Sequence, residues 1–306
     1  MVIELEGLTK YYGAIKALDD VGLRLDAGAV GLLGPNGAGK STLIKCLLGL
    51  VRVSMGEGRV LGLDIRRRSR EIRQRIGYMP EDDCYFIGLS AVECVAYTGE
   101  LAGMHRREAL RRAHEILDWV GIAEERYREL QTFSTGMKQK AKLAQALIHD
   151  PELVFLDEPT NGLDPEGRDR MLKLISNLAT KRNITVLLST HLLHDIEVVC
   201  SHVVIVGRGR LLKSDSLAKL QQSASDNYTI DLHAESAPFA EALRGSGCTV
   251  AVSTPTQLRV SGAANIPQLS FATANRLQAR IRQLQLTRSS LESIYLDAIA
   301  VAPPKA

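Results

Sequence analysis

The segment from Gly34 to Thr42 has the residue types and spacing of a site for a nucleoside triphosphate. It reads Gly-Pro-Asn-Gly-Ala-Gly-Lys-Ser-Thr and satisfies the pattern G-x-x-x-x-G-K-[ST]. Glycines permit a tight turn whose backbone N–H groups converge on an anion. Lys40 would then reach the outer phosphates as a point charge, and Ser41 would offer a hydroxyl to Mg²⁺. A glycine-rich turn that binds nothing is the weaker alternative.

Two carboxylates follow an apolar stretch farther along the chain. Residues 153–156 are Leu-Val-Phe-Leu, as in the middle of a parallel sheet, and Asp157 and Glu158 come next. Ligands bind beyond the carboxyl ends of such strands, so Asp157 would hold Mg²⁺ directly or through water. Glu158 would accept a proton from, or orient, the water that attacks the terminal phosphate. Alternatively, both acids only begin the next helix. The phosphate-binding segment upstream favours the catalytic interpretation.

A third candidate is the segment 133–139, Phe-Ser-Thr-Gly-Met-Lys-Gln, which precedes a predicted helix. Ser134 as the N-cap would leave backbone N–H groups free at the positive end of the helix dipole, where anions bind. Many helices begin with serine, so the signal gains weight only from its place just before the strand that leads to Asp157 and Glu158.

A parallel sheet is needed to bring these candidates together, and the patterns predict one. Segment 29–33 reads as a buried strand and 41–50 as a helix, and residues before 29 alternate like strands with one buried face. Strands at 153–156, 185–189 and 202–206 alternate with helices at 165–180 and 192–199. This alternation predicts a doubly wound α/β sheet.

A helical insert interrupts that sheet at about residues 82–150. Ser90 and Glu93 have the spacing of a capping box. In the predicted helix 106–120, one apolar face is expected to contain Ala109, Leu110, Ala113, Ile116, Leu117 and Val120.

The length of 306 residues and a change of composition near residue 214 predict two domains, 1–214 and 215–306. In the second, a small α/β accessory domain, we expect a helix in 215–226 that leads into a linker, strands at 228–233 and 248–253, and a helix at 276–286. The five cysteines are scattered without metal-ligand spacing, which is typical of reduced thiols in a cytosolic protein. No signal-peptide layout or membrane-length apolar run is present, so the polypeptide is not expected to cross a membrane by itself.

The charge of the chain does not favour a nucleic-acid partner. The formal net charge of +3 is small. The stretch Arg66-Arg67-Arg68-Ser69-Arg70, with Arg73 and Arg75, is basic but lacks interleaved aromatic residues. We interpret it as a solvated helix face on the surface of the first domain.

Taken together, five segments resemble the ATP-binding cassette (ABC) ATPases in their order and spacing. These are Gly34–Thr42, Ser134–Gln139, Leu156–Thr160, Gly162–Pro165 and Ser189–His191. The resemblance covers residues 2 to about 214. It is closest to the nucleotide-binding subunit of bacterial drug- and lipid-efflux exporters, to whose C-terminal segment Ser289–Tyr295 is also similar. It implies a P-loop (RecA-like) parallel core, an N-terminal antiparallel β-subdomain and the helical insert.

The resemblance implies the ligands and their positions. Tyr12 would stack on adenine, and His191 would contact the γ-phosphate and the attacking water. Ser134 and Gly136 would contact the terminal phosphate of the ATP on the opposite subunit, while Asp164 would couple the two sites. His194 is expected to be structural. ATP and Mg²⁺ would be held by Asn36, Gly37, Gly39, Lys40, Ser41 and Thr42.

Two segments depart from the family pattern. Glu81 in Gly77-Tyr78-Met79-Pro80-Glu81 replaces a glutamine that contacts magnesium. It can still bind the ion, but its charge is expected to weaken the binding of metal-free ATP. In the signature segment, Phe133, Thr135 and Met137 replace family residues, and Thr135 adds bulk where glycine is usual.

The sequence therefore predicts an ATP-hydrolysing subunit of an ABC transporter, an exporter that works as a homodimer. Membrane-spanning permease subunits would dock near Glu81 and Cys84–Ser90, which would place the chain peripherally on the cytoplasmic face of the cell membrane. One alternative is a soluble ABC ATPase that acts on ribosomes or nucleic acid. Such proteins usually carry two cassettes or a long coiled-coil insert, which this chain lacks. A P-loop kinase is a second alternative, in which Ser134, Asp164 and His191 would have no role.

Overall fold

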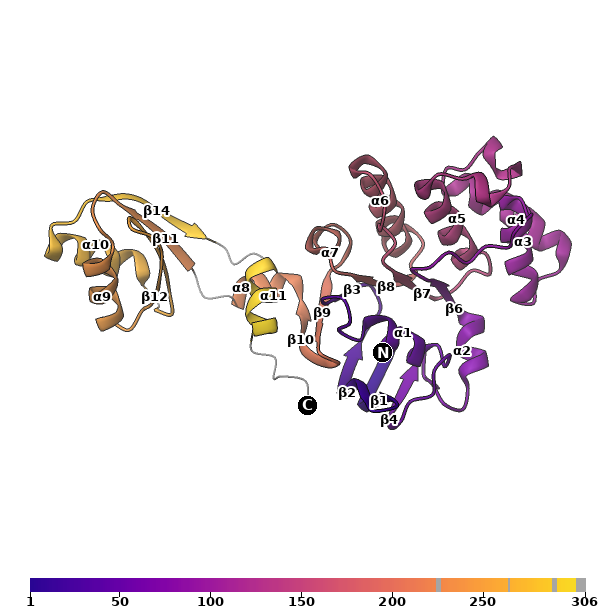
Figure 1. The fold of residues 1–306 in the computed structure, drawn as a ribbon, viewed down its shortest axis with the longest axis horizontal. Helices are drawn as coiled ribbons and strands as arrows, with labels where there is room; N and C mark the ends of the chain where they lie inside the picture. Colours follow the sequence, from indigo (N-terminus) through magenta and orange to yellow (C-terminus); the bar gives the residue numbers. More distant parts are fainter. Residues whose placement is uncertain (224–226, 264, 288–290, 301–306) are drawn as a thin grey trace. The chain divides into compact units, whose positions relative to one another are not determined.

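The computed structural model describes residues 1–223, 227–263, 265–287 and 291–300. The chain divides into two compact units (Figure 1). The larger contains Met1–Ser216 together with the described end of the chain, residues 298–300, and the smaller contains Leu217–Asp297. This division lies close to the boundary expected after residue 214. Among the described residues, no helix is both long enough and apolar enough to cross a membrane.

A six-stranded sheet in the order β10-β9-β3-β8-β7-β6 forms the centre of the larger unit. Its strands are β3 (Ala29–Leu33), β6 (Ile76–Met79), β7 (Leu153–Asp157), β8 (Thr185–Thr190), β9 (His202–Gly207) and β10 (Arg210–Ser216). All pairings are parallel except that of β10 with β9. Every residue of β3, β7 and β8 is buried, which confirms that their apolar runs are central strands. Their carboxyl ends consequently meet at one edge of the sheet.

Helices and a second sheet cover this centre (Figure 1). The second sheet is antiparallel, with strands β1 (Ile3–Tyr12), β2 (Ile15–Leu25), β4 (Met55–Val60) and β5 (Leu63–Asp64) in the order β2-β1-β4-β5. The helices are α1 (Lys40–Leu47), α2 (Ser69–Arg75), α6 (Pro165–Lys181) and α7 (Leu193–Val199). Leu43, Ile44 and Leu47 of α1 belong to the same core cluster as Ile3 and Leu5 of β1.

Two details of these helices differ from the sequence prediction. Helix α1 ends at Leu47 rather than Leu50, because Gly49 adopts a left-handed φ of 64° that stops the helix. Only part of the basic stretch is helical, since Arg66, Arg67 and Arg68 precede α2.

The helical insert contains α3 (Ala91–Leu101), α4 (Arg106–Trp119), two short 3₁₀ turns (Glu124–Tyr127 and Leu130–Thr132) and α5 (Thr135–Leu147). The capping box is confirmed. The Ser90 side chain accepts from the Glu93 backbone N–H, and the Glu93 carboxylate accepts from the Ser90 N–H at 2.9 Å. The predicted face of α4 was wrong at Leu110, which is 44% exposed and lies at the margin of the buried stripe.

The smaller unit has the β-α-β-β-α-β order and antiparallel pairing of a ferredoxin-like fold. Its elements are β11 (Asn227–Leu232), α9 (Ala237–Gly245), β12 (Thr249–Thr254), β13 (Gln257–Ser261), α10 (Ile266–Leu277) and β14 (Ile281–Thr287), with α8 (Leu217–Ser223) before and α11 (Leu291–Ala300) after them. Its sheet order is β12-β13-β11-β14.

The expected helix at 276–286 was wrong. Helix α10 ends at Leu277, Gln278 takes a left-handed φ of 50°, and β14 then pairs with β11, with Leu284 opposite Ile230. Glutamine and leucine favour helices, but pairing with a distant strand outweighs this weak local preference. Of the segment likened to exporter C-termini, Ser289 and Ser290 lie outside the described residues.

Candidate active site

The phosphate-binding loop joins β3 to α1 and requires glycine at specific positions. A Cβ on Gly34 would lie 2.4 Å from the carbonyl oxygen of Val206. Gly39 has a φ of 105°, and a Cβ there would lie 2.8 Å from the carbonyl oxygen of Ala17. The loop can therefore pack against its neighbours and still present its backbone to a ligand.

A cavity of about 410 Å³ lies on this loop, at the carboxyl edge of the sheet. It brings together most of the residues predicted to hold the nucleotide and metal: Asn36, Gly37, Gly39, Lys40, Ser41, Thr42, Glu81, Asp157 and Glu158. Strand order explains this, because β3 ends at the loop while β7, one strand beyond β8, ends at Asp157.

Two opposite charges are buried in this cavity. Lys40 Nζ donates to the carbonyl oxygen of Gly34 at 2.6 Å and lies 3.6 Å from Glu158 Oε1. Only 6% of Lys40 and 5% of Glu158 are exposed. A buried charge is costly unless it is paired, so each of these side chains offsets the cost of the other.

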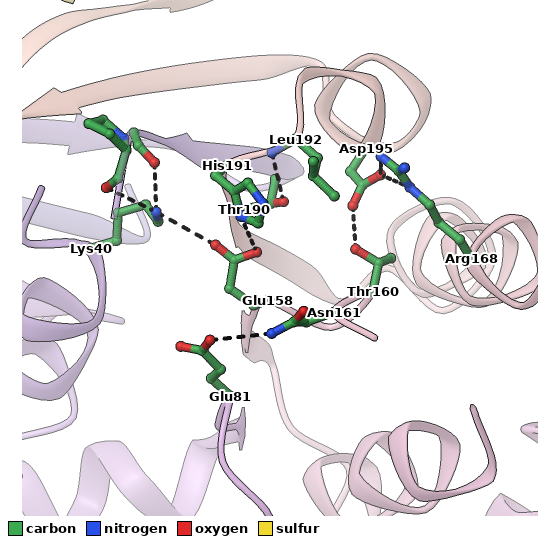
Figure 2. Close-up of polar contacts among 12 residues, drawn as sticks. Lys40, Glu81, Glu158, Thr160, Asn161, Arg168, Thr190, His191, Leu192 and Asp195 are labelled. Carbon is green, nitrogen blue, oxygen red and sulfur yellow. Dashed lines mark hydrogen bonds and ion pairs between the residues drawn. The ribbon is translucent and has the colours of Figure 1, made fainter. Parts of the chain in front are cut away.

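Glu158 also contacts His191, which comes from the end of the neighbouring strand β8. Glu158 Oε2 and His191 Nδ1 are 3.0 Å apart (Figure 2). Glu158 has a left-handed φ of 49°, unusual for a residue with a side chain, and its N–H donates to the carbonyl oxygen of Ser189. The next helix begins only at Pro165. The alternative in which the two acids begin that helix is therefore wrong.

Glu81 approaches the same cavity from the segment after β6. Its Oε1 accepts from Asn161 Nδ2 at 3.4 Å (Figure 2). Its backbone oxygen accepts from Lys142 Nζ at 2.7 Å. Burial lowers the pKa of Lys142. Glu81 is thus tethered through its backbone to α5, while its carboxylate stays exposed beside the loop.

The carboxylate oxygens in this cavity suit a cation that also binds phosphate. Asp157 Oδ1 is buried and has no hydrogen-bond partner among the described residues. The described residues contain no group of three or more His, Cys, Asp or Glu side chains placed to hold a metal by themselves. Mg²⁺ typically uses one or two carboxylates together with substrate phosphates. Ser41 and Asp157 fit that pattern.

A second cavity, of about 460 Å³, contains the remaining predicted residues. Ser134, Gly136 and Asp164 line it, together with Thr135 and Gly162. The Ser134 side chain accepts from the Met137 N–H at the start of α5, and Asp164 caps α6 by accepting from the Gly167 N–H. The two cavities share no lining residue.

Thr135 of the signature segment lies against Gly162, where the absence of a side chain leaves room for the threonine. Gly162 has a φ of 74°, and a Cβ there would lie 3.2 Å from Thr135 Cγ2. The bulk that Thr135 adds is thus directed toward a glycine that leaves room for it.

Tyr12 is not among the residues that line the first cavity. It is 44% exposed, and Lys10 Nζ lies 4.8 Å from the centre of its ring. Sequence reasoning missed Ile15 and Ala17, which do line the cavity. Their only signal was their position just after the Tyr12-Gly13 turn.

Sequence reasoning also missed a buried network behind the catalytic candidates. Thr160 Oγ1 donates to Asp195 Oδ2 at 2.5 Å, and Arg168 Nε donates to Asp195 Oδ1 at 2.7 Å (Figure 2). The Asp195 side chain is fully buried. The network ties the segment after Glu158 to α6 and α7, which begin beside Asp164 and His191.

The fold and the phosphate-binding loop are those of an ATP-binding cassette, and comparisons with known proteins agree. Residues 18–161 match the ABC transporter family. The chain is 40% identical to the bacitracin transport ATP-binding protein BcrA of Bacillus licheniformis over 213 residues. This match covers 69% of each chain. Over 303 residues it is 34% identical to the daunorubicin/doxorubicin resistance ATP-binding protein DrrA of Streptomyces peucetius, covering 96% of this chain and 91% of that one.

The chain is also similar to a solved structure of a cassette that has hydrolysed its ATP. The ATP-binding cassette MJ0796, dimeric and bound to ADP and Pi after hydrolysis, is 25% identical with a TM-score of 0.64, over 70% of this chain and 98% of that one. The chain belongs to the ATP-binding subunits of ABC transporters. It is an ATPase of the transporter type, which rules out the soluble ABC ATPase and the kinase as alternatives.

Proposed function

We propose that two copies of this chain sandwich each ATP between the first cavity of one subunit and the second cavity of the other. The separation of the two cavities carries this proposal. Lys40 and Glu158 are in one, whereas Ser134, Gly136 and Asp164 are in the other. A single copy therefore holds two incomplete half-sites. A dimer with two-fold symmetry would complete both ATP sites at once. In such a dimer the first cavity of each subunit faces the second cavity of the other.

Glu158 is the proposed general base, and His191 orients it. A carboxylate only accepts hydrogen bonds, so Nδ1 of His191 carries the proton in their 3.0 Å contact. A hydrogen bond from Nε2 to a γ-phosphate oxygen would require that nitrogen to carry a proton as well, as in the imidazolium form of His191. Lys40 is drawn from Glu158 toward the phosphates when ATP binds, which leaves Glu158 free to accept the proton of the attacking water.

Mg²⁺ is the proposed metal, held by Ser41 and Asp157 with Glu81 as a further ligand. Asp157 Oδ1 supports this assignment, because it is buried and has no hydrogen-bond partner in the described part of the chain. When bound, the ion neutralises charge on the phosphates. Tyr12 stays the proposed adenine contact, with Ile15 and Ala17 as additional walls of the cavity.

The proposed docking site for a membrane-spanning partner lies at the expected segment Cys84–Ser90. Phe86 and Ile87 are exposed there, and Ile87 is 84% exposed. Phe86 packs edge-on against the half-exposed Tyr97 of α3, with ring centres 5.0 Å apart. Exposed apolar residues gathered in this way are typical of a protein interface. Docking there would hold the chain on the cytoplasmic face of the membrane.

Because relatives are named for bacitracin transport and for daunorubicin/doxorubicin resistance, export of bulky antibiotic-like compounds is the proposed activity.

The variant Glu158→Gln tests the sandwich. It should bind ATP with unchanged affinity, lose about 10²–10⁴-fold in turnover as expected when a general base is removed, and form a stable dimer with ATP. ATP titration, phosphate release and light scattering measure the three properties. The exposed Glu100→Gln on α3 is the matched control and should behave like the native chain.

The double variant Ser134→Arg, Glu158→Gln distinguishes the role of the second cavity from that of the first. The dimer should disappear while the monomer still binds ATP, because Ser134 does not line the first cavity. Loss of monomer binding, or a dimer that persists, would contradict the proposed sandwich. Full turnover in Glu158→Gln would remove Glu158 from the mechanism.

A further inference from the structure

Positive charge is concentrated in one segment of the larger unit that the ATPase site does not use. Eight arginines and three acids lie between Arg52 and Arg75, which gives a formal net charge of +5, whereas the whole chain carries +3. The segment runs from the end of α1 through β4 and β5 to α2 (Figure 1).

A third cavity, of about 360 Å³, opens in this segment. Arg52, Arg66 and Ser69 contribute polar groups to its wall, and Cys46 and Val53 contribute buried apolar ones. It lies at the carboxyl end of α1, whereas Lys40 and the ATP cavity lie at the amino end. The third cavity is therefore distinct from both halves of the ATP site.

Two arginines that line this cavity, and two that are adjacent in sequence to its lining residues Arg66 and Ser69, form no ion pair with any residue that the structure describes. They are Arg52, Arg66, Arg67 and Arg70, and all four are exposed. Their neighbours Arg68 and Arg75 are paired with Glu71 and Glu152. Asp64 is the nearby acid, and its carboxylate accepts the backbone N–H groups of Arg66 and Arg67.

We infer that this arginine cluster, Arg52, Arg66, Arg67 and Arg70, binds the anionic surface of the membrane, with one lipid phosphate headgroup in the third cavity. Guanidinium groups match the geometry of phosphate oxygens. Clusters of four or more arginines or lysines are attracted to anionic lipid. Leu50, beside the cavity wall, is 54% exposed and adds an apolar group of the kind found at membrane interfaces.

Two other polyanions fit the observations less well. Nucleic acid is usually bound with aromatic side chains among the basic ones, and the residues from Arg52 to Arg75 contain none. An acidic protein segment would need an extended groove, whereas the cavity that Arg52 and Arg66 line is compact. The inference gives the subunit a membrane contact of its own, besides any contact through a partner.

Vesicle co-sedimentation of the full chain tests this inference. The protein should bind vesicles that contain phosphatidylglycerol and not vesicles of phosphatidylcholine alone, and binding should weaken as salt rises. Replacing Arg66 and Arg67 together by Gln should weaken binding about 25-fold, since each arginine near an anionic surface contributes about fivefold. The matched control replaces Arg106 and Arg107 of α4, an adjacent exposed pair without ion pairs among the described residues. This control should retain most of the binding.

The cavity itself is tested by Arg52→Gln and by competition. Inorganic phosphate should release the native chain from anionic vesicles more effectively than chloride at equal ionic strength, and Arg52→Gln should remove this difference. ATP hydrolysis without vesicles should be unchanged in all of these variants, which shows that they fold. The inference would be overturned if both arginine pairs lost binding equally, or if the native chain did not bind anionic vesicles at low salt. It would also be overturned if phosphate and chloride released the chain equally, or if duplex DNA or polyglutamate bound more tightly at the same residues.

Discussion

At the scale of single residues, the first cavity depends on a balance of buried and exposed charge. Lys40 and Glu158 neutralise each other while both are buried. Glu81, by contrast, brings an exposed carboxylate to the wall of the cavity. In the proposed site, bound magnesium would compensate that charge, whereas without the metal the charge would face the phosphates of ATP.

We therefore expect Glu81→Gln to strengthen the binding of metal-free ATP by about two- to fivefold, the modest effect of a solvent-screened charge. Binding in the presence of Mg²⁺ should change less or weaken, because a proposed ligand of the ion is lost. Titration with a fluorescent ATP analogue in EDTA and in Mg²⁺ measures both. Equal affinities of native and variant protein in EDTA would contradict this charge effect.

At the scale of elements, strand order determines which chemical groups meet. Because β3, β8 and β7 are neighbours, the phosphate loop, His191 and Asp157-Glu158 emerge at one edge of the sheet. The buried carboxylate of Asp195 then joins the elements behind that edge. It binds Thr160 after β7 and Arg168 in α6, so the orientation of α6 is linked to that of α7.

Asp195→Asn should lower the free energy of unfolding by about 1–3 kcal/mol, because Arg168 loses its charged partner. Turnover should also fall, since Glu158 and His191 are less well positioned, whereas ATP affinity should remain, because the phosphate loop is untouched. Urea denaturation, phosphate release and ATP titration distinguish these effects. Asp169→Asn, an exposed neighbour on α6, should change none of them. If the Asp195 variant were destabilised but turned over normally, the network would be structural only.

At the scale of the whole molecule, the residues that line the first and second cavities all lie within the larger unit. The last strand of its central sheet, β10, pairs with β9 and ends at Ser216. The ferredoxin-like unit has a separate core that includes Ile230, Phe239 and Leu258. Each unit thus has the core that an independently folding domain requires.

A chain that ends at Ser216 should therefore fold and bind ATP with the affinity of the full chain. Circular dichroism and ATP titration check this expectation, and failure to fold would show that the smaller unit is needed to complete the cassette. Dimer formation, turnover and membrane association of the shortened chain then report on the smaller unit. If all three were unchanged, that unit would have no regulatory or dimerising role.

The sequence alone determined the features that depend on neighbouring residues. The phosphate loop, the Ser90 capping box, the Ser134 cap and the apolar strand before Asp157 could all be predicted, because turns, caps and strands are encoded over a few residues. The contact between Glu158 and His191, the network around Asp195 and the division of the site into two cavities could not be derived from local pattern. They depend on strand order and on helix ends that are distant in the chain. The strand β14 was mistaken for a helix for the same reason: its partner β11 is remote, and only tertiary pairing outweighs the local preference.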